Sequence, residues 1–405
     1  MNTDRCNRAV LTLADGSICQ IHDDATAVYP IKETDRSIAS VQICSRTGFT
    51  VTQTIDYSIY ARLPFPMNKE RDITAIVCEA LKCEPNCISE IIVDSYQIAA
   101  RSDRTVCFIS FYRLNHPSVI YAHEQDIGHT IMKQIVLDSD IDLFSFKWRH
   151  GFVRTVDGYL HSFGNRERHN ALSISLDQPI VFHDVPGIRE ITCGQSYSLL
   201  LMLDGTVYAQ GFNYDTRDAS FEQIQFANSA SINKIVTDSY HIIYISSAGT
   251  CYYSNTHEPI IKGRTGCMVP HILTGLQGYF VENAFILANC IIIQHDKGTI
   301  SLVPLTRHVR FNAAIYYIIS NKQIYNQKKP IALQYFNDKY VVNILQLGHH
   351  ILFVTEDGCA YRSPISDNYY MNALVIEPVS FFTDNPIAVS SSTLRIPATQ
   401  SILTQ

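Results

Sequence analysis

The chain has 405 residues, a formal net charge of −6 and a pI near 6.2. Apolar residues make up 46% and charged residues only 17%, a balance that excludes disorder over most of the length. The sequence has no long run of Lys and Arg, which a protein that neutralises many phosphates needs, so direct nucleic-acid binding is disfavoured. Abundant Tyr (23) and Phe (19), beside many Ile and Val, favour half-buried β-strands over helices.

The sequence shows no targeting or membrane-spanning segment. Its first residues, MNTDRCNRAV, lack the charged-then-apolar order of a secretion signal, and the longest apolar stretches, such as 284–293, are too short to cross a bilayer. The twelve cysteines are scattered, and several lie inside apolar runs, where free Cys behaves as a small hydrophobe. We therefore expect no membrane span. We also expect a reducing compartment, the cytoplasm, and the nucleus is the alternative. The cysteines in apolar runs are Cys44, Cys107, Cys193 and Cys290.

In chain order, the predicted elements are β-hairpins that share one pattern. Asp-Gly between two β-rich runs is a strong hairpin signal, because the turn needs a positive φ. Two or three residues after most turns come a β-former and usually an aromatic residue, and a His or aromatic ring lies seven residues before six of the eight turns. The clear turns are Asp15-Gly16, Asp157-Gly158, Asp204-Gly205 and Asp357-Gly358, and the weaker ones are Asp56-Tyr57, Asp103-Arg104, Ala248-Gly249 and Lys297-Gly298.

The spacing of the turns predicts the fold. Successive turns are 41, 47, 54, 47, 44, 49 and 60 residues apart, a period that suits one four-stranded blade per repeat. We predict an all-β fold, a seven-bladed β-propeller of a single domain over 1–405. The first hairpin (9–21) and a tail strand (387–396) would share a blade and close the ring. A further hairpin at 315–325 makes eight blades the alternative.

Two stretches interrupt the repeat. Residues 63–87 and 113–137 are long inserts with several prolines, and the first could hold a short helix at 74–82. Inserts of this kind tend to emerge on one face of a propeller and often carry recognition.

The best copy of the repeat resembles a known family. The pattern Cys-Gly-x-x-Tyr-Ser-Leu-x-Leu-x-x-Asp-Gly-x-Val-Tyr-x-x-Gly-x-Asn, at 193–213, is similar to the repeat of the regulator of chromosome condensation family. That resemblance implies a seven-bladed propeller. Family members include a guanine nucleotide exchange factor for a nuclear small GTPase, and many propellers that only bind proteins. Here the glycines that usually follow the final Asn are absent from 166–172 and 214–219, which leaves inherited activity open.

Candidate sites are few. Cys78, Cys83 and Cys87 do not have the pair spacing of a zinc site, so a loop with free thiols is the preferred interpretation. His150, His241 and His350 keep a fixed offset from the turn, so we expect structural bonds between neighbouring blades. Lys147, Trp148 and Arg149 are the candidate partner-binding residues, since a large aromatic beside Arg is favoured at interfaces. Packing of Trp148 between blades is the alternative.

No catalytic constellation is apparent. The sequence has no Gly-rich phosphate loop, no G-x-S-x-G elbow and no nucleophile with its base, so we expect neither an enzyme nor a cofactor or metal. The predicted function is a non-catalytic protein-interaction propeller, a scaffold or structural subunit of a larger assembly. The alternative is an exchange factor or regulator of a Ras- or Ran-like small GTPase.

Overall fold

We analysed a computed structural model of the chain. It describes residues 9–12, 18–21, 28–30, 38–43, 49–62, 70–94, 97–110, 130–147, 150–164, 187–194, 197–210, 221–237, 241–255, 270–273, 276, 278–287, 290–296, 300–304, 331–333, 340–347, 350–364 and 377–378. Contacts group the chain into two compact units: unit 1 is Met1–Val10 and Lys32–Val185, and unit 2 is Leu11–Ile31 and Pro186–Gln405. Among these described residues, no helix has the length and hydropathy of a membrane span.

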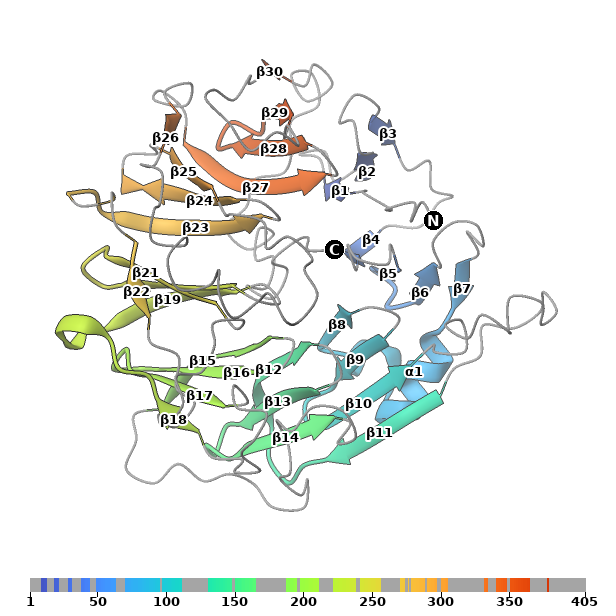
Figure 1. The fold of residues 1–405 in the computed structure, drawn as a ribbon. Coiled ribbons are helices and arrows are strands. Elements are labelled where there is room, and N and C mark those ends of the chain that lie inside the picture. The colour runs from blue at the N-terminus through green and yellow to red at the C-terminus, as the bar shows by residue number, and fades with distance from the viewer. Residues whose placement is uncertain are drawn as a thin grey trace, which may run out of the picture. The chain divides into compact units, whose positions relative to one another are not determined.

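Unit 1 holds three antiparallel sheets in its described residues, and their strands follow chain order (Figure 1). The first is β4 (Ile38–Ile43), β5 (Thr50–Thr54), β6 (Ile59–Arg62) and β7 (Glu70–Asp72); the second is β8 (Glu90–Asp94), β9 (Gln97–Arg101), β10 (Thr105–Ser110) and β11 (Thr130–Val136); the third is β12 (Ile141–Lys147), β13 (His150–Thr155) and β14 (Leu160–Gly164).

Helix α1 (Thr74–Leu81) and a 3-10 turn (Pro85–Cys87) lie between the first two sheets in sequence, inside the first predicted insert. The helix confirms the short helix expected at 74–82. It ends where Lys82 adopts a left-handed conformation, φ 54°, and its apolar face is buried against the same core as the two sheets. Residues 113–129 of the second insert lie outside the described residues.

Unit 2 holds four sheets of the same order in the part of the chain that the structure describes. They are β15 (Ile188–Cys193), β16 (Ser198–Met202), β17 (Val207–Gln210) and β18 (Glu222–Gln223); β19 (Ile232–Thr237), β20 (His241–Ser246), β21 (Cys251–Asn255) and β22 (His271–Ile272); β23 (Val281–Leu287), β24 (Cys290–His295), β25 (Ile300–Pro304) and β26 (Ile331–Leu333); and β27 (Val341–Leu347), β28 (His350–Thr355), β29 (Ala360–Pro364) and β30 (Glu377–Pro378). A 3-10 turn, Ala227–Ser229, lies between β18 and β19.

A further sheet is formed by β1 (Ala9–Thr12), β2 (Ile18–Ile21) and β3 (Val28–Pro30). The described residues therefore form eight sheets of three or four strands, each an up-and-down series of the kind that makes one propeller blade. The expected all-β fold of repeated blades is confirmed. Ring closure and the choice between seven and eight blades stay predictions, because 387–396 and 315–325 lie outside the described residues.

The turn between the second and third strands is the same structure in sheet after sheet. The last residue of the second strand, for example Thr155, receives a hydrogen bond from the glycine N–H three residues on (2.8 Å) and donates one to the carbonyl four residues on (3.0 Å). The predicted equivalence of the repeats is therefore visible in backbone geometry. The residues that make both bonds in this way are Thr155, Met202, Ser246 and Thr355, and Thr54 makes the equivalent pair with Tyr57 in place of the glycine.

The first strand of a sheet begins with a β-branched residue followed by a bulge. Ile188 pairs with Met202, whereas the next pair is Glu190 with Leu201, so one extra residue bends the strand there. The same shift recurs at the matching point of five other sheets, and the first residue is buried wherever its burial is described. The bulged strands begin at Ile38, Ile141, Ile188, Ile232, Val281 and Val341.

The core of each unit lies between neighbouring sheets. In unit 2, side chains of β16 and β17 pack with those of β19 and β20 in one apolar cluster, and similar clusters join the next sheets. Two more clusters join the three sheets of unit 1. Burial of a large apolar side chain is worth about 1.5–3 kcal/mol, so this packing of sheet on sheet is the main source of stability within each unit.

Gly194 shows why the best repeat has Cys-Gly before its ring residue. The ring of Tyr197 is fully buried, and a Cβ on Gly194 would lie 2.1 Å from it. The Gly194 N–H also donates to the Tyr197 carbonyl (2.8 Å), which closes the loop between β15 and β16. A glycine is needed there because the Tyr197 ring packs directly against the backbone and leaves no room for a Cβ atom.

Candidate partner-binding surfaces

Each sheet has two different ends. Because the strands run up and down in order, the turn between the second and third strands lies at the same end as the start of the first strand. We call this the turn end. The hairpin loop between the first and second strands lies at the opposite end, which we call the hairpin end.

Of the predicted partner-binding residues, only Lys147 is described, at the hairpin end of the β12–β14 sheet. Trp148 and Arg149 follow it in the sequence and lie outside the described residues. Lys147 is the last residue of β12, pairs with His150, and is 8% exposed. Of the three, Lys147 therefore offers a partner little surface, and the role of the other two stays a prediction.

The predicted turn residues lie at the turn end and bind their own loops. The Asp204 carboxylate accepts hydrogen bonds from the Thr206 N–H (2.8 Å) and hydroxyl (2.7 Å). Asp357 likewise accepts from the Cys359 N–H (3.1 Å). Gly158, Gly205 and Gly358 all have a positive φ, between 78° and 92°. Asp157 lies in the same turn position, whereas Asp15 and Gly16 are outside the described residues.

Gly205 also forms part of the junction between two sheets of unit 2. Its carbonyl accepts from the Ile232 N–H (2.8 Å), at the start of the next sheet. An added Cβ would lie 2.0 Å from the Ser231 hydroxyl oxygen and 2.9 Å from the Ile232 nitrogen. The turn glycine is therefore fixed by two constraints, its positive φ and the close approach of the neighbouring strand.

Opposite charges meet at the same junction. Glu190 of β15 and Lys234 of β19 are equivalent bulge residues of neighbouring sheets, and both are half-buried. Burial raises the pKa of Glu190, and that rise is counteracted by a hydrogen bond from Thr192 and by the charges of Arg189 and Lys234. Burial lowers the pKa of Lys234, and Glu190 counteracts it in turn. Arg189 adds a hydrogen bond to Asn233 across the junction. These polar groups therefore stabilise the sheets' mutual packing.

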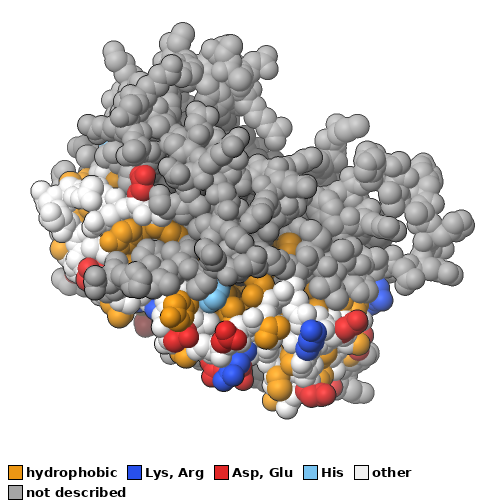
Figure 2. All heavy atoms as spheres, turned by 90° about the horizontal axis from the view of Figure 1, so that it is seen from below, with side chains coloured by type: hydrophobic (Ala, Val, Ile, Leu, Met, Phe, Trp, Pro, Cys, Tyr) orange, Lys and Arg blue, Asp and Glu red, His pale blue; other side chains and the backbone are white. Residues whose placement is uncertain are grey.

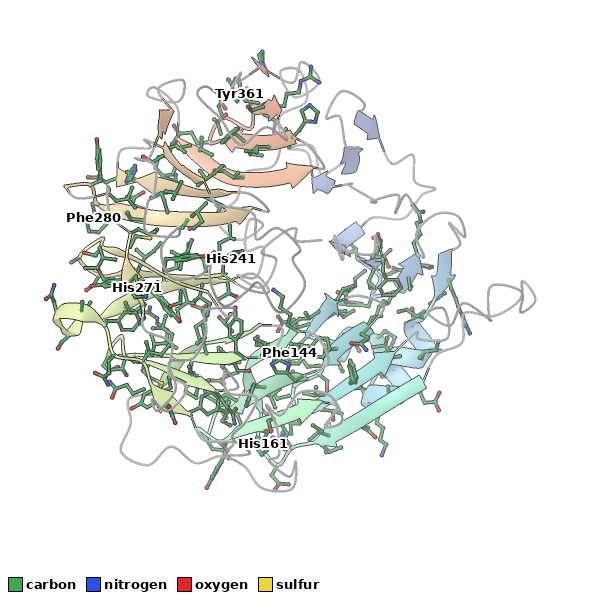
Figure 3. All side chains as sticks on the ribbon, in the orientation of Figure 1. Phe144, His161, His241, His271, Phe280 and Tyr361 are labelled. Carbon is green, nitrogen blue, oxygen red and sulfur yellow. The ribbon has the colours of Figure 1, made fainter. Side chains whose placement is uncertain are left out.

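The repeated histidines share one place in the fold. His150, His241 and His350 are each the first residue of a second strand, just after the hairpin loop. The ring of His241 stacks on Tyr253 of its own sheet, with 6.1 Å between centroids. Figure 3 labels His241 among the strands of unit 2. The expected bonds between neighbouring blades stay a prediction.

The cysteines near α1 pack as apolar groups. Cys78 and Cys83 lie against the apolar core of unit 1, whereas Cys87 is exposed. Burial raises the pKa of Cys83 to about 11, so its thiol stays protonated at neutral pH. Among the described residues, no three His, Cys, Asp or Glu side chains come together as metal ligands.

The sequence analysis missed the exposed large apolar residues. Nine described residues of this kind are between 39% and 65% exposed, and all belong to the turn ends of their sheets. Three of them directly precede the Asp of a turn, so the repeat pattern marks the position where such residues occur. They are Ile55, Tyr57, Val136, Val156 and Tyr159 in unit 1, and Leu203, Ile272, Tyr279 and Phe280 in unit 2. Figure 3 labels Phe280 at the start of β23.

No protein-family model matches the chain, and no curated protein matches its sequence. Solved structures do resemble it. Human WBSCR16 is 15% identical, with a TM-score of 0.46, over 75% of this chain and 83% of that chain. Prp20p from Saccharomyces cerevisiae is 11% identical, with a TM-score of 0.46, over 76% and 80%. Hsv2 from Kluyveromyces lactis is 11% identical, with a TM-score of 0.47, over 84% and 97%.

Another similar structure carries the description of yeast RCC1 (Prp20) bound to Kap60.

Proposed function

We propose that this chain is a non-catalytic protein-interaction propeller, a fixed component of a larger assembly in the cytoplasm. The observation that carries the proposal is the set of nine large apolar side chains exposed at the turn ends. They all lie at the same end of their sheets, so each of these sheets offers apolar contact area to a partner at that end.

The fold supports this use because the repeat's own polar groups are engaged within the protein. Asp204 and Asp357 bind their own turns, and Arg189 bonds Asn233 of the neighbouring sheet. Rigid repeated sheets can therefore present varied loop residues without reorganisation, which lowers the cost of ordering a surface when a partner binds.

Affinity isolation of the full chain from its native source, followed by mass spectrometry and size-exclusion chromatography, tests the proposal. We expect a stable complex of defined composition. A variant with Ile55→Ser, Val156→Ser and Leu203→Ser should lose partners, because it removes apolar contact area at the turn ends. The matched control, Glu222→Gln with Gln223→Asn, changes exposed residues of another edge. A free monomer as the only species would contradict the proposal.

Exchange-factor activity is the second candidate. The solved structure of Prp20p is described together with its binding to Gsp1p and histones. The repeat at 193–213 resembles that of the regulator of chromosome condensation family. Such a factor needs no catalytic side chains, because it acts by opening the nucleotide site of its partner. The release of a labelled guanine nucleotide from a panel of small GTPases would test it. Faster release supports exchange activity, whereas unchanged release excludes it and leaves the scaffold as the proposed function.

A further inference from the structure

One part of unit 1 combines exposed apolar residues with carboxylates. It lies at the turn ends of the β8–β11 and β12–β14 sheets, and we call it the acidic turn surface. Val136 and Val156 are 65% and 63% exposed, and Tyr159 is 41% exposed. Asp138, two residues after Val136, and Asp157, directly after Val156, are exposed as well.

Backbone hydrogen bonds fix this surface, and one of them joins the two sheets: the Ile141 N–H donates to the Asp103 carbonyl (2.7 Å). Within the first sheet, the Leu137 N–H donates to the Arg104 carbonyl (2.9 Å). The Val156 N–H donates to the Asp140 carbonyl (2.8 Å), which ties the second turn to the same link. The residues that follow β11 and those of the β13–β14 turn therefore have fixed relative positions.

His161 gives independent support for this proximity. Burial lowers its pKa, while Asp157 and Asp138 both raise it, so both carboxylates act on one imidazole. Figure 3 labels His161 on β14. The two aspartates come from different loops, and the fold brings their charges to one place.

The arginines of these sheets are already paired. Arg101 binds Glu90 (3.0 Å), and Arg104 binds Asp140 (2.5 Å). Arg154 binds Asp142, with its Nε 3.0 Å from a carboxylate oxygen.

Asp103, Asp138 and Asp157 therefore remain as the excess charge among the described residues of this end. Figure 2 shows part of the described surface, where apolar side chains lie between charged ones of both signs.

We infer that the acidic turn surface binds a basic protein segment in which Lys or Arg residues flank large apolar side chains. The inference rests on the proposed function and gives it a surface and a partner chemistry. The apolar side chains would supply contact area, and the aspartates would pair with the cations and guide the approach. Nucleic acids and anionic lipids carry the same charge sign as this surface, so both are repelled from it.

A random 12-residue peptide library displayed on phage, selected against the full folded chain, tests the inference. We expect enriched peptides with a net positive charge and at least one large apolar residue. Synthetic copies should bind more weakly as salt rises, because screening weakens the attraction between exposed charges. Val136→Ser with Val156→Ser should lower their affinity about fivefold or more, the loss typical of removed interface anchors.

Charge reversal gives the sharper result. Asp138→Lys with Asp157→Lys should abolish binding of the basic peptides and allow binding of peptides in which Glu replaces each Lys or Arg. The matched control is Glu222→Gln with Gln223→Asn, which removes an acid and changes its exposed neighbour on β18 of unit 2. It should bind like the wild type.

The two proposals fail in different ways. Enriched peptides without a basic bias, or peptides that bind all variants alike, would overturn the inference about this surface. Partners isolated from the native source would still support the proposed function in that case. If the chain has no native partner, the proposed function fails whatever the peptides do.

Discussion

The junction between β15 and β19 in unit 2 and the acidic turn surface in unit 1 use polar residues near the turn end in different ways. At the junction, Glu190 and Lys234 are half-buried, and the Gly205 carbonyl accepts a hydrogen bond from the next strand. At the turn surface, Asp138 and Asp157 remain exposed beside Val136 and Val156. Polar groups that face a neighbouring sheet are paired within the protein, whereas those that face solvent are available to a partner.

The largest effect is expected at the junction, from Gly205→Ala. The added Cβ would clash with the Ile232 backbone and would occupy a left-handed φ of 84°, so we expect a loss of roughly 2–4 kcal/mol in the free energy of unfolding. Urea unfolding measures it. Gly278→Ala is the matched control: its φ is 88°, but no described atom lies within 4 Å of the new Cβ, so only about 1 kcal/mol should be lost. Equal losses in the two variants would show that the close approach at Gly205 is unimportant.

A smaller loss is expected for Lys234→Met. Glu190 would keep its burial, its hydrogen bond from Thr192 and the charge of Arg189, but would lose the charge of Lys234, so its pKa would rise further and the variant should be about 1 kcal/mol less stable at pH 7. A carboxyl group with a raised folded-state pKa lowers the stability only at pH values at which it is ionised. The deficit should therefore shrink as the pH falls toward 4, where Glu190 is protonated.

Unfolding curves at several pH values check this prediction. The double variant, Lys234→Met with Glu190→Gln, should recover much of the loss. A deficit that is constant with pH would exclude the attraction between Lys234 and Glu190 as its cause.

The smallest effect on stability is expected at the turn surface. Val156→Ser and Asp157→Asn change exposed side chains, so each should alter the free energy of unfolding by no more than about 0.5 kcal/mol. Thermal unfolding measures this. The same variants should weaken the peptide binding described above. A large loss of stability would mean that these residues hold the sheets together, which would remove the distinction between the two regions.

Much of the fold could be predicted because single residues impose strong local constraints. Asp204-Gly205 predicts its turn because glycine readily adopts a positive φ, and the fixed offsets of the other turns predict repeated hairpins. The helix at Thr74–Leu81 follows from an apolar stretch between breaks. These features depend on neighbours in sequence, so a single sequence is enough to find them.

The acidic turn surface could not be predicted in the same way. The apolar residue before each turn is visible at Ile55, Val156 and Leu203, but a sequence does not show that this position faces solvent. Val136 ends a strand, where an apolar residue is ordinarily expected to be buried. The proximity of Asp138 and Asp157 depends on hydrogen bonds between two sheets. Exposure and proximity of this kind depend on packing between distant segments.

Hydrogen exchange of the full chain, alone and with its natural partner, tests the central claim most directly. The account predicts that amides of 136–141 and 156–161 exchange more slowly in the complex, while those of 188–193 and 232–237, already bonded within unit 2, do not change. Protection confined to other segments, with the acidic turn surface unaffected, would contradict it.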